Sequence, residues 1–218
     1  LQVVSYALPA LIAVGQCRHL CAAQARGGWP WGRWLAGTLL RRLEKLQPPH
    51  GGFLDAIPLT AFVCLALRHA GYGGHPVVQK GRAFLRQAVR PDGSWAIDSN
   101  LRTWVTSLAT RAVVAARSFL PDGDSRVPSS ELERIADWLV SAQVTRRHPF
   151  TGAAPGGWAW TDLPGGVPDA DDTAGALVAL KCLQEAGCAP KAMPAVRAGV
   201  IWLLALQNRD GGLPTFCR

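Results

Sequence analysis

Three aspartates lie close together in the sequence, as Asp169, Asp171 and Asp172, and they open an apolar segment that contains Leu177 and Leu180. At about 100° per residue, Asp169 and Asp172 share one face of a helix and Asp171 points elsewhere. Three carboxyl groups this close cannot all ionise cheaply, so we expect one of them to keep its proton. An acid that keeps its proton beside an apolar, water-poor cavity is placed to protonate a carbon–carbon double bond.

An ordinary aspartic acid, with a pKa of about 3.9, is a weak acid for this reaction. Hydrogen bonds and the helix N-terminus would have to stabilise the carboxylate that remains.

The same acids also have a purely structural interpretation. Aspartate is a favoured N-cap residue, acids in the first turn suit the helix dipole, and a proline such as Pro168 is common near helix starts. Both interpretations stay open at this point.

Helical periodicity dominates the rest of the chain, because apolar residues recur at three- and four-residue steps. There is no sustained strand alternation and no Asn-Gly hairpin, so we predict an all-α protein. The segments expected to be helical are roughly 3–24, 35–46, 58–71, 76–89, 100–119, 130–144, 171–187 and 192–207.

Glycine-rich turns recur between these helices, and each is followed by an aromatic residue or leucine. We expect glycine to end the preceding helix with a positive φ, a nearby glutamine to bridge helix ends, and the aromatic ring to pack over them. Such repeats predict stacked helix pairs, which bury their apolar faces only against one another. The turns are Gly51-Gly52-Phe53, Asp92-Gly93-Ser94-Trp95, Gly156-Gly157-Trp158 and Gly211-Gly212-Leu213.

The repeats predict one domain over 1–218, with residues 144–157, rich in Arg, Gly and Pro, as an exposed inserted loop. The chain begins inside an apparent helix at Leu1 and stops at Arg218, directly after a repeat turn. We therefore interpret the sequence as part of a longer domain.

Composition excludes several classes of protein. Of 218 residues, 49% are hydrophobic and 17% charged, which excludes a disordered tail. The net charge of +8 lacks the dense Lys/Arg footprint of a nucleic-acid binder. The longest apolar stretch, Val3–Val14, is too short to span a bilayer, and no basic leader or cleavage site marks a signal peptide.

Neither the cysteines nor the histidines show metal-ligand spacing. Cys17 and Cys21 are four residues apart and Cys182 and Cys188 are six apart, so neither pair forms a CxxC motif. We expect buried free thiols, no metal and no other cofactor.

The stretch GGWAW at 156–160, followed after eight residues by DADDTA at 169–174, resembles the active-site region of squalene–hopene cyclases, which are class II terpene cyclases. The glycine–aromatic turns resemble the QW repeats of that family. The resemblance implies an α/α barrel, or toroid, of which this chain is an incomplete part. It also implies an isoprenoid substrate such as squalene and a cytoplasmic location, peripheral or monotopic on the membrane.

Site residues follow from the resemblance. Asp171 would donate the proton, Asp169 and Asp172 would support it, and Trp104 and Trp160 would line the substrate pocket. The family's supporting histidine would lie beyond the last residue of this sequence.

The chain also departs from the family pattern. Val89 stands where the repeat glutamine belongs, Leu213 replaces the final aromatic residue, and Val105 occupies a position that is acidic in typical members.

Two alternatives remain at this stage. A class II cyclase of a prenyl diphosphate also uses DxDD, although the sequence has no basic, glycine-rich phosphate cradle. A non-catalytic helical toroid that binds isoprenoids or proteins would fit the degenerate repeats, but the intact DADDT motif argues against it.

Overall fold

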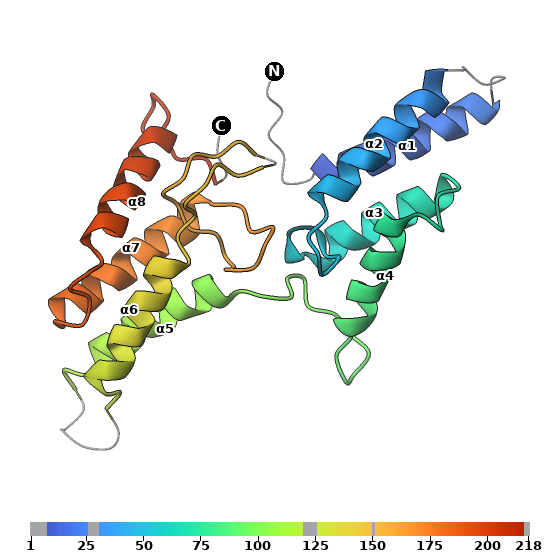
Figure 1. Cartoon of the computed structure of the whole chain (residues 1–218). Helices are drawn as coiled ribbons and strands as arrows, with labels where there is room; N and C mark the ends of the chain where they lie inside the picture. Colours follow the sequence, from blue (N-terminus) through green and yellow to red (C-terminus); the bar gives the residue numbers. More distant parts are fainter. Residues whose placement is uncertain (1–7, 26–30, 120–125, 150, 216–218) are drawn as a thin grey trace. The chain divides into compact units, whose positions relative to one another are not determined.

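The computed structural model describes residues 8–25, 31–119, 126–149 and 151–215 (Figure 1). Within these ranges the regular structure is helical, and only isolated β-bridges such as that between Trp158 and Asp169 occur in place of strands. The predicted all-α class is confirmed. The helices are α1 (Leu8–Ala25), α2 (Trp31–Leu46), η1 (Phe53–Asp55, a short 3-10 helix), α3 (Ile57–His69), α4 (Pro76–Gln87), α5 (Arg102–Ala116), α6 (Ser129–Ser141), α7 (Ala170–Glu185) and α8 (Met193–Leu206).

Helices α3 to α7 end two or three residues earlier than the apolar pattern predicts. Helix α3 stops at His69 and is followed by Gly71 with φ +86°, and α7 stops at Glu185 and is followed by Gly187 with φ +75°. Positive φ interrupts helical hydrogen bonding, whereas the apolar periodicity continues into the turn.

The chain divides into two compact units. The first unit comprises residues 1–99 with 163–165, and in it α3 packs against both α1 and α4. The second unit comprises residues 100–162 with 166–218, and in it α7 packs against α5, α6 and α8. Each unit is thus built around one helix that follows a glycine turn.

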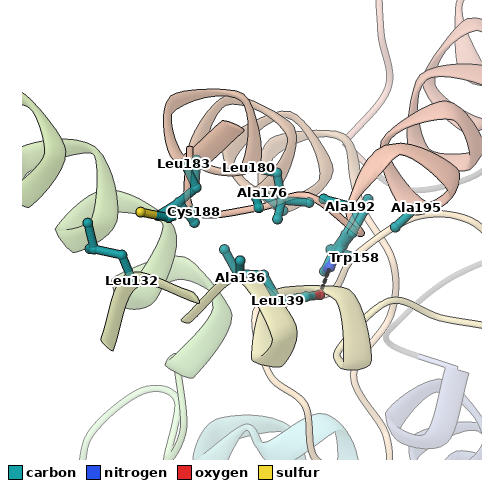
Figure 2. Packing of buried hydrophobic residues seen from close by; sticks show 12 residues of the cluster. Leu132, Ala136, Leu139, Trp158, Ala176, Leu180, Leu183, Cys188, Ala192 and Ala195 are labelled. Carbon is teal, nitrogen blue, oxygen red and sulfur yellow. Dashed lines mark hydrogen bonds between the residues drawn. The ribbon is translucent and has the colours of Figure 1, made fainter. Parts of the chain in front are cut away.

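A buried cluster of leucine, alanine and tryptophan side chains forms the core of the second unit (Figure 2). Leu132 and Leu139 come from α6, and Leu180 and Leu183 from α7. Trp158 is fully buried among them, and its indole N–H donates to the Leu139 carbonyl at 2.7 Å. This hydrogen bond satisfies the polar atom that burial of a tryptophan would otherwise leave without a partner.

The two glycine turns that precede α3 and α7 share a hydrogen-bonding arrangement. The Gln47 amide donates to the carbonyls of Gly51 and Val77, at 2.9 Å each. The Gln143 amide donates to the carbonyls of Gly156 and Ala195, at 2.7 and 2.9 Å. In both turns the glutamine connects the glycine to the start of the second helix after the turn, α4 in the first unit and α8 in the second. The sequence predicted this bridging of helix ends.

Residues 144–157 contain both exposed and buried side chains. Arg146 and Arg147 are exposed, whereas His148, Thr151 and Ala153 are buried. Burial lowers the pKa of His148. The segment returns to the body of its unit where the Gly156 N–H donates to the Val144 carbonyl.

No helix in the described part of the chain combines the length and apolarity needed to cross a membrane.

Candidate active site

The first turn of α7 carries all three aspartates. Asp169 is the N-cap residue, with extended backbone, and its carboxylate Oδ1 accepts from the Asp172 N–H at 2.8 Å. Its own N–H donates to the Trp158 carbonyl at 3.0 Å, so the start of the helix is tied to the glycine turn. Asp169 therefore caps the helix, as its residue type predicts. This structural role applies to Asp169 and not to Asp171 or Asp172.

The helix sorts the three carboxyl groups by exposure. Asp169 and Asp172 are buried, at 3% and 5% relative exposure, while Asp171 is exposed. The i, i+3 spacing places the first two on the buried side and turns the third away, as the periodicity predicts.

Burial and mutual repulsion shift the ionisation of the buried pair. Burial, followed by the charge of Asp172, raises the pKa of Asp169 to about 8. Burial is also the main cause that raises the pKa of Asp172 to about 6. A hydrogen bond between the two carboxyl groups favours the proton on Asp169. The pair thus holds a proton at neutral pH, as expected for crowded acids.

A pocket of about 270 Å³ lies beside this turn, between α5 and α7. Asp171 and Asp172 line it, and Asp172 Oδ1 is a buried atom without a hydrogen-bond partner in the described structure. A buried carboxylate oxygen without a donor is costly, so this atom is a position at which a bound donor or a proton would be stabilised. The other lining residues are Trp104, Ser107, Leu108, Arg111, Ala174, Gly175 and Val178.

The two tryptophans expected at the pocket lie differently. Trp104, on α5, lines the pocket and is 40% exposed. Trp160 is half-buried and is not among the residues that line this pocket; its carbonyl accepts from the Thr103 N–H at 3.0 Å. The structure therefore brings Trp104, but not Trp160, to the pocket that the acids line.

Sequence reasoning missed the other α5 residues of the pocket wall. Ser107, Leu108 and Arg111 follow Trp104 at steps of three, four and seven residues, the spacing of one helix face. This spacing is the signal in the sequence that could have identified them. Once Trp104 is assigned to a cavity wall, the spacing predicts that these three residues lie on the same helix face.

A second pocket, of about 400 Å³, lies in the first unit between α3 and α4. No acidic side chain lines it in the described structure, and its charged residues are Arg68 and Arg82. Of these two pockets, the one at the start of α7 is therefore the one lined by acidic side chains.

Comparison with known proteins agrees with the resemblance to squalene–hopene cyclases over the region that contains the three aspartates. The family model of the squalene-hopene cyclase C-terminal domain matches residues 102–218, more than half of the chain. Sporulenol synthase of Bacillus subtilis is 27% identical over 186 residues, which are 82% of this chain and 26% of that protein. Squalene–hopene cyclase of Bradyrhizobium diazoefficiens is 27% identical over 140 residues, 64% of this chain and 19% of that protein.

A terpene cyclase–glycosyl transferase fusion protein of Humicola fuscoatra is 29% identical over 151 residues, 65% of this chain and 11% of that protein. The matched part of the chain thus spans about a quarter or less of the length of these relatives. The matched domain is an α/α toroid, so the predicted fold class is confirmed.

Proposed function

Because the chain belongs to the squalene-hopene cyclase family, we propose that it carries the acid cluster of a terpene cyclase that protonates a terminal double bond of a polyene. Asp171 is the proton donor, and Asp169 and Asp172 support it. One observation carries this proposal: Asp171 and Asp172 line the same pocket as Trp104.

The proton transfer is simple to write. The O–H bond of Asp171 breaks, the proton adds to one alkene carbon, and a tertiary cation forms at the other, leaving an aspartate anion. The positive end of the α7 dipole stabilises that anion, because Asp171 lies in the first helical turn. The proton held by the Asp169–Asp172 pair removes one negative charge from the surroundings of that anion.

Trp104 supplies the opposite wall of the pocket. An indole face stabilises a cation by about 2 kcal/mol or more in a dry site. At about 270 Å³ the pocket lies below the usual 300–1,000 Å³ of ligand pockets, so it fits the reacting end of a polyene rather than the whole chain. Trp160, which does not line this pocket, remains a proposed substrate-binding residue.

We also propose a peripheral contact with the membrane on its cytoplasmic side. A squalene-type isoprenoid dissolves in the bilayer, so the enzyme must meet it at the membrane surface. The net charge of +8 and the exposed pairs Arg41-Arg42 and Arg146-Arg147 suit anionic headgroups.

The test is incubation of the full-length protein with squalene in detergent, followed by analysis of the hydrocarbons. Wild type is expected to form cyclised products, and Asp171→Asn is expected to lose about 10²–10⁴-fold in rate, the contribution typical of a general acid. The matched control is Asp137→Asn, the same substitution at an exposed position on α6. Full activity in Asp171→Asn would refute the assignment of the donor.

The alternatives give different results in the same assay. Turnover of geranylgeranyl diphosphate with magnesium, but not of squalene, would indicate a diphosphate cyclase. Unchanged squalene together with equal squalene affinity in wild type and Asp171→Asn would indicate a binding module.

A further inference from the structure

Two cysteines of α1 and one histidine of α3 come together in the first unit. One ligand atom from each of Cys17, Cys21 and His69 lies within 4.8 Å of the other two. The two cysteines are half-buried and His69 is exposed, and both thiols are free. This group lies outside the acid cluster and has no role in the proposed protonation.

Helix geometry explains why the three residues meet. Cys17 and Cys21 are at positions i and i+4, so both thiols project from one face of α1. Helix α1 packs against α3, and His69 is the last residue of α3. The third ligand is thus supplied by tertiary packing across 48 residues of sequence (69 − 21).

The chemistry of the group suits a borderline-soft cation. Two thiolates and an imidazole are preferred zinc ligands, with Zn–S of about 2.3 Å and Zn–N of about 2.0–2.1 Å. In a tetrahedron these bonds place the ligand atoms about 3.5–3.8 Å apart. The atoms found within 4.8 Å of one another therefore need only small side-chain rotations to reach zinc geometry.

Charge also favours a divalent ion over the free thiols. A doubly charged ion bound by two thiolates and a neutral imidazole forms a group with no net charge. Such a group is compatible with the exposed Arg18 and Arg68, each adjacent in sequence to a ligand.

We propose that Cys17, Cys21 and His69 form a zinc site that links α1 to α3, with solvent as the fourth ligand. The exposure of His69 leaves that fourth position open to water. Because binding to the folded state alone adds stability, zinc holds the two helices together in the first unit.

The experiment is a Co²⁺ titration of the full-length, metal-free protein under a phosphine reductant, which keeps the thiols reduced. Wild type is expected to bind a single cobalt ion, with a thiolate-to-cobalt charge-transfer band and the intense visible bands of tetrahedral cobalt, and zinc should displace it. Cys17→Ser, Cys21→Ser and His69→Ala should each weaken cobalt binding at least tenfold.

Two matched controls distinguish a built site from general affinity. Cys182→Ser removes a half-buried free thiol of the second unit, and His19→Ala removes an exposed imidazole of α1. Both should bind cobalt as wild type does. Far-UV circular dichroism verifies the fold of every variant, and the exposed His69 gives a variant that does not disturb the core.

A second readout does not depend on cobalt spectra. Zinc should raise the melting temperature of wild type but leave that of His69→Ala unchanged. Absence of a charge-transfer band in reduced wild type, equal loss in the two controls, or binding of copper(I) without cobalt or zinc would overturn the zinc assignment.

Discussion

Helices α3 and α7 begin with the same hydrogen-bonded arrangement of a turn and a threonine. Comparing the two helix starts shows which features belong to the acids of α7. In the first unit the Phe53 N–H donates to Thr60 Oγ1 at 2.9 Å, and in the second the Trp158 N–H donates to Thr173 Oγ1 at 2.9 Å. Both threonines are fully buried. The threonine therefore joins the aromatic residue of the turn to the helix in the same way in each unit.

Alignment on these threonines shows what differs. Ala56 is the N-cap of α3 where Asp169 caps α7, and Pro58 and Leu59 precede Thr60 where Asp171 and Asp172 precede Thr173. Pro58 and Asp171 are exposed, and Leu59 and Asp172 are buried. A helix start of this kind thus forms without any of the three acids. The N-cap hydrogen bond explains Asp169 structurally, so Asp171 and Asp172 are the acids that call for a chemical explanation.

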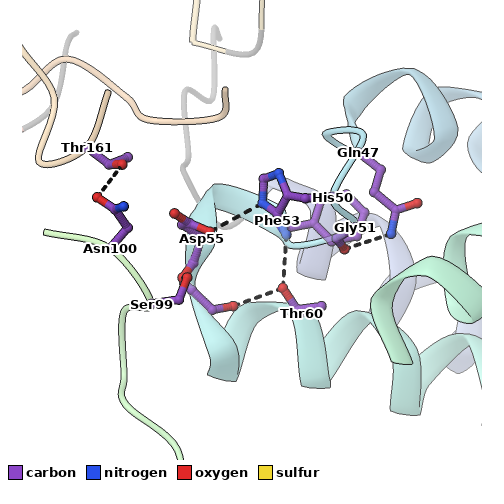
Figure 3. Close-up of polar contacts among 10 residues, drawn as sticks. Gln47, His50, Gly51, Phe53, Asp55, Thr60, Ser99, Asn100 and Thr161 are labelled. Atoms are coloured by element: carbon purple, nitrogen blue, oxygen red, sulfur yellow. Dashed lines mark hydrogen bonds and ion pairs between the residues drawn. The ribbon is translucent and has the colours of Figure 1, made fainter. Parts of the chain in front are cut away.

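The buried acid next to each turn has different neighbours, which include an imidazole only in the first unit. In the first unit Asp55 lies 3.3 Å from the His50 imidazole, a contact drawn in Figure 3. Burial, and then the charge of Asp55, raises the pKa of the half-buried Asp98. In the second unit Asp169 lies against another acid, Asp172, and its pKa rises to about 8. An imidazole can compensate a buried carboxylate, whereas a second carboxyl group forces one of the two to keep its proton.

The largest expected effect comes from breaking the turn in either unit. Gly51 and Gly156 have φ of +93° and +121°, and an added Cβ would lie 2.4 Å from the Lys80 carbonyl oxygen and 2.9 Å from that of Ala198. Gly51→Ala and Gly156→Ala should each cost about 2–4 kcal/mol, from left-handed strain plus the clash with backbone. Urea denaturation measures the loss.

The control for these glycines is Gly187→Ala, where φ is +75° and nothing lies within 4 Å of the added Cβ. It should cost about 1 kcal/mol, the strain alone. If Gly156→Ala lowered the free energy of unfolding and Gly51→Ala did not, the two turns would not be equivalent.

The next effect tests the shared threonine. Thr60→Val and Thr173→Val keep the shape of the side chain but leave the N–H of Phe53 or Trp158 without its acceptor, at a cost of about 1–3 kcal/mol each. Thr110→Val is the control, because that buried hydroxyl bonds only to the Thr106 carbonyl of its own helix. Urea denaturation should show similar losses at Thr60 and Thr173, and a smaller one at Thr110.

The raised pKa of Asp169 predicts a pH dependence of stability in the second unit. The folded pKa of about 8 exceeds the ordinary 3.8, so the folded state binds more protons over that window and stability falls as pH rises from about 4 to about 8. Asp169→Asn keeps an N-cap and removes the titration of this one carboxyl group, so it should be more stable than wild type at pH 8, by about 1–2 kcal/mol.

Hydrogen exchange of the α7 amides between pH 5 and pH 8, corrected for intrinsic rates, measures this difference. Asp137→Asn, at an exposed position, should track wild type. If Asp169→Asn kept the wild-type slope, the retained proton would not be on Asp169.

The smallest expected effect on stability comes from replacing two acids at the start of α7 by the residues found at the same positions of α3. The double variant Asp171→Pro, Asp172→Leu should change stability by less than about 1 kcal/mol, because proline is tolerated in the first helical turn and leucine already fills the buried position in α3. Cyclisation should be abolished. A variant that unfolds would mean that the acids are structural.

The sequence was a sound guide wherever the interaction is local. Periodicity predicted the helices and the shared face of Asp169 and Asp172, and residue type predicted the N-cap. It did not predict that Trp104 lines the acid pocket while Trp160 does not, because that depends on how α5 packs against α7. It also did not predict that three of the five described cysteines, Cys17, Cys21 and Cys182, would be only half-buried.

The order of residue types along the chain by itself determined the helices, the glycine turns and the crowding of three carboxyl groups, because each is settled within one or two helical turns. Tertiary structure alone decided which oxygens lose contact with water, which helix faces the acids, and that His69 meets Cys17 and Cys21. Burial and proximity arise from the packing of segments distant in sequence, and these two quantities control the ionisation of a carboxyl group and the assembly of a metal site.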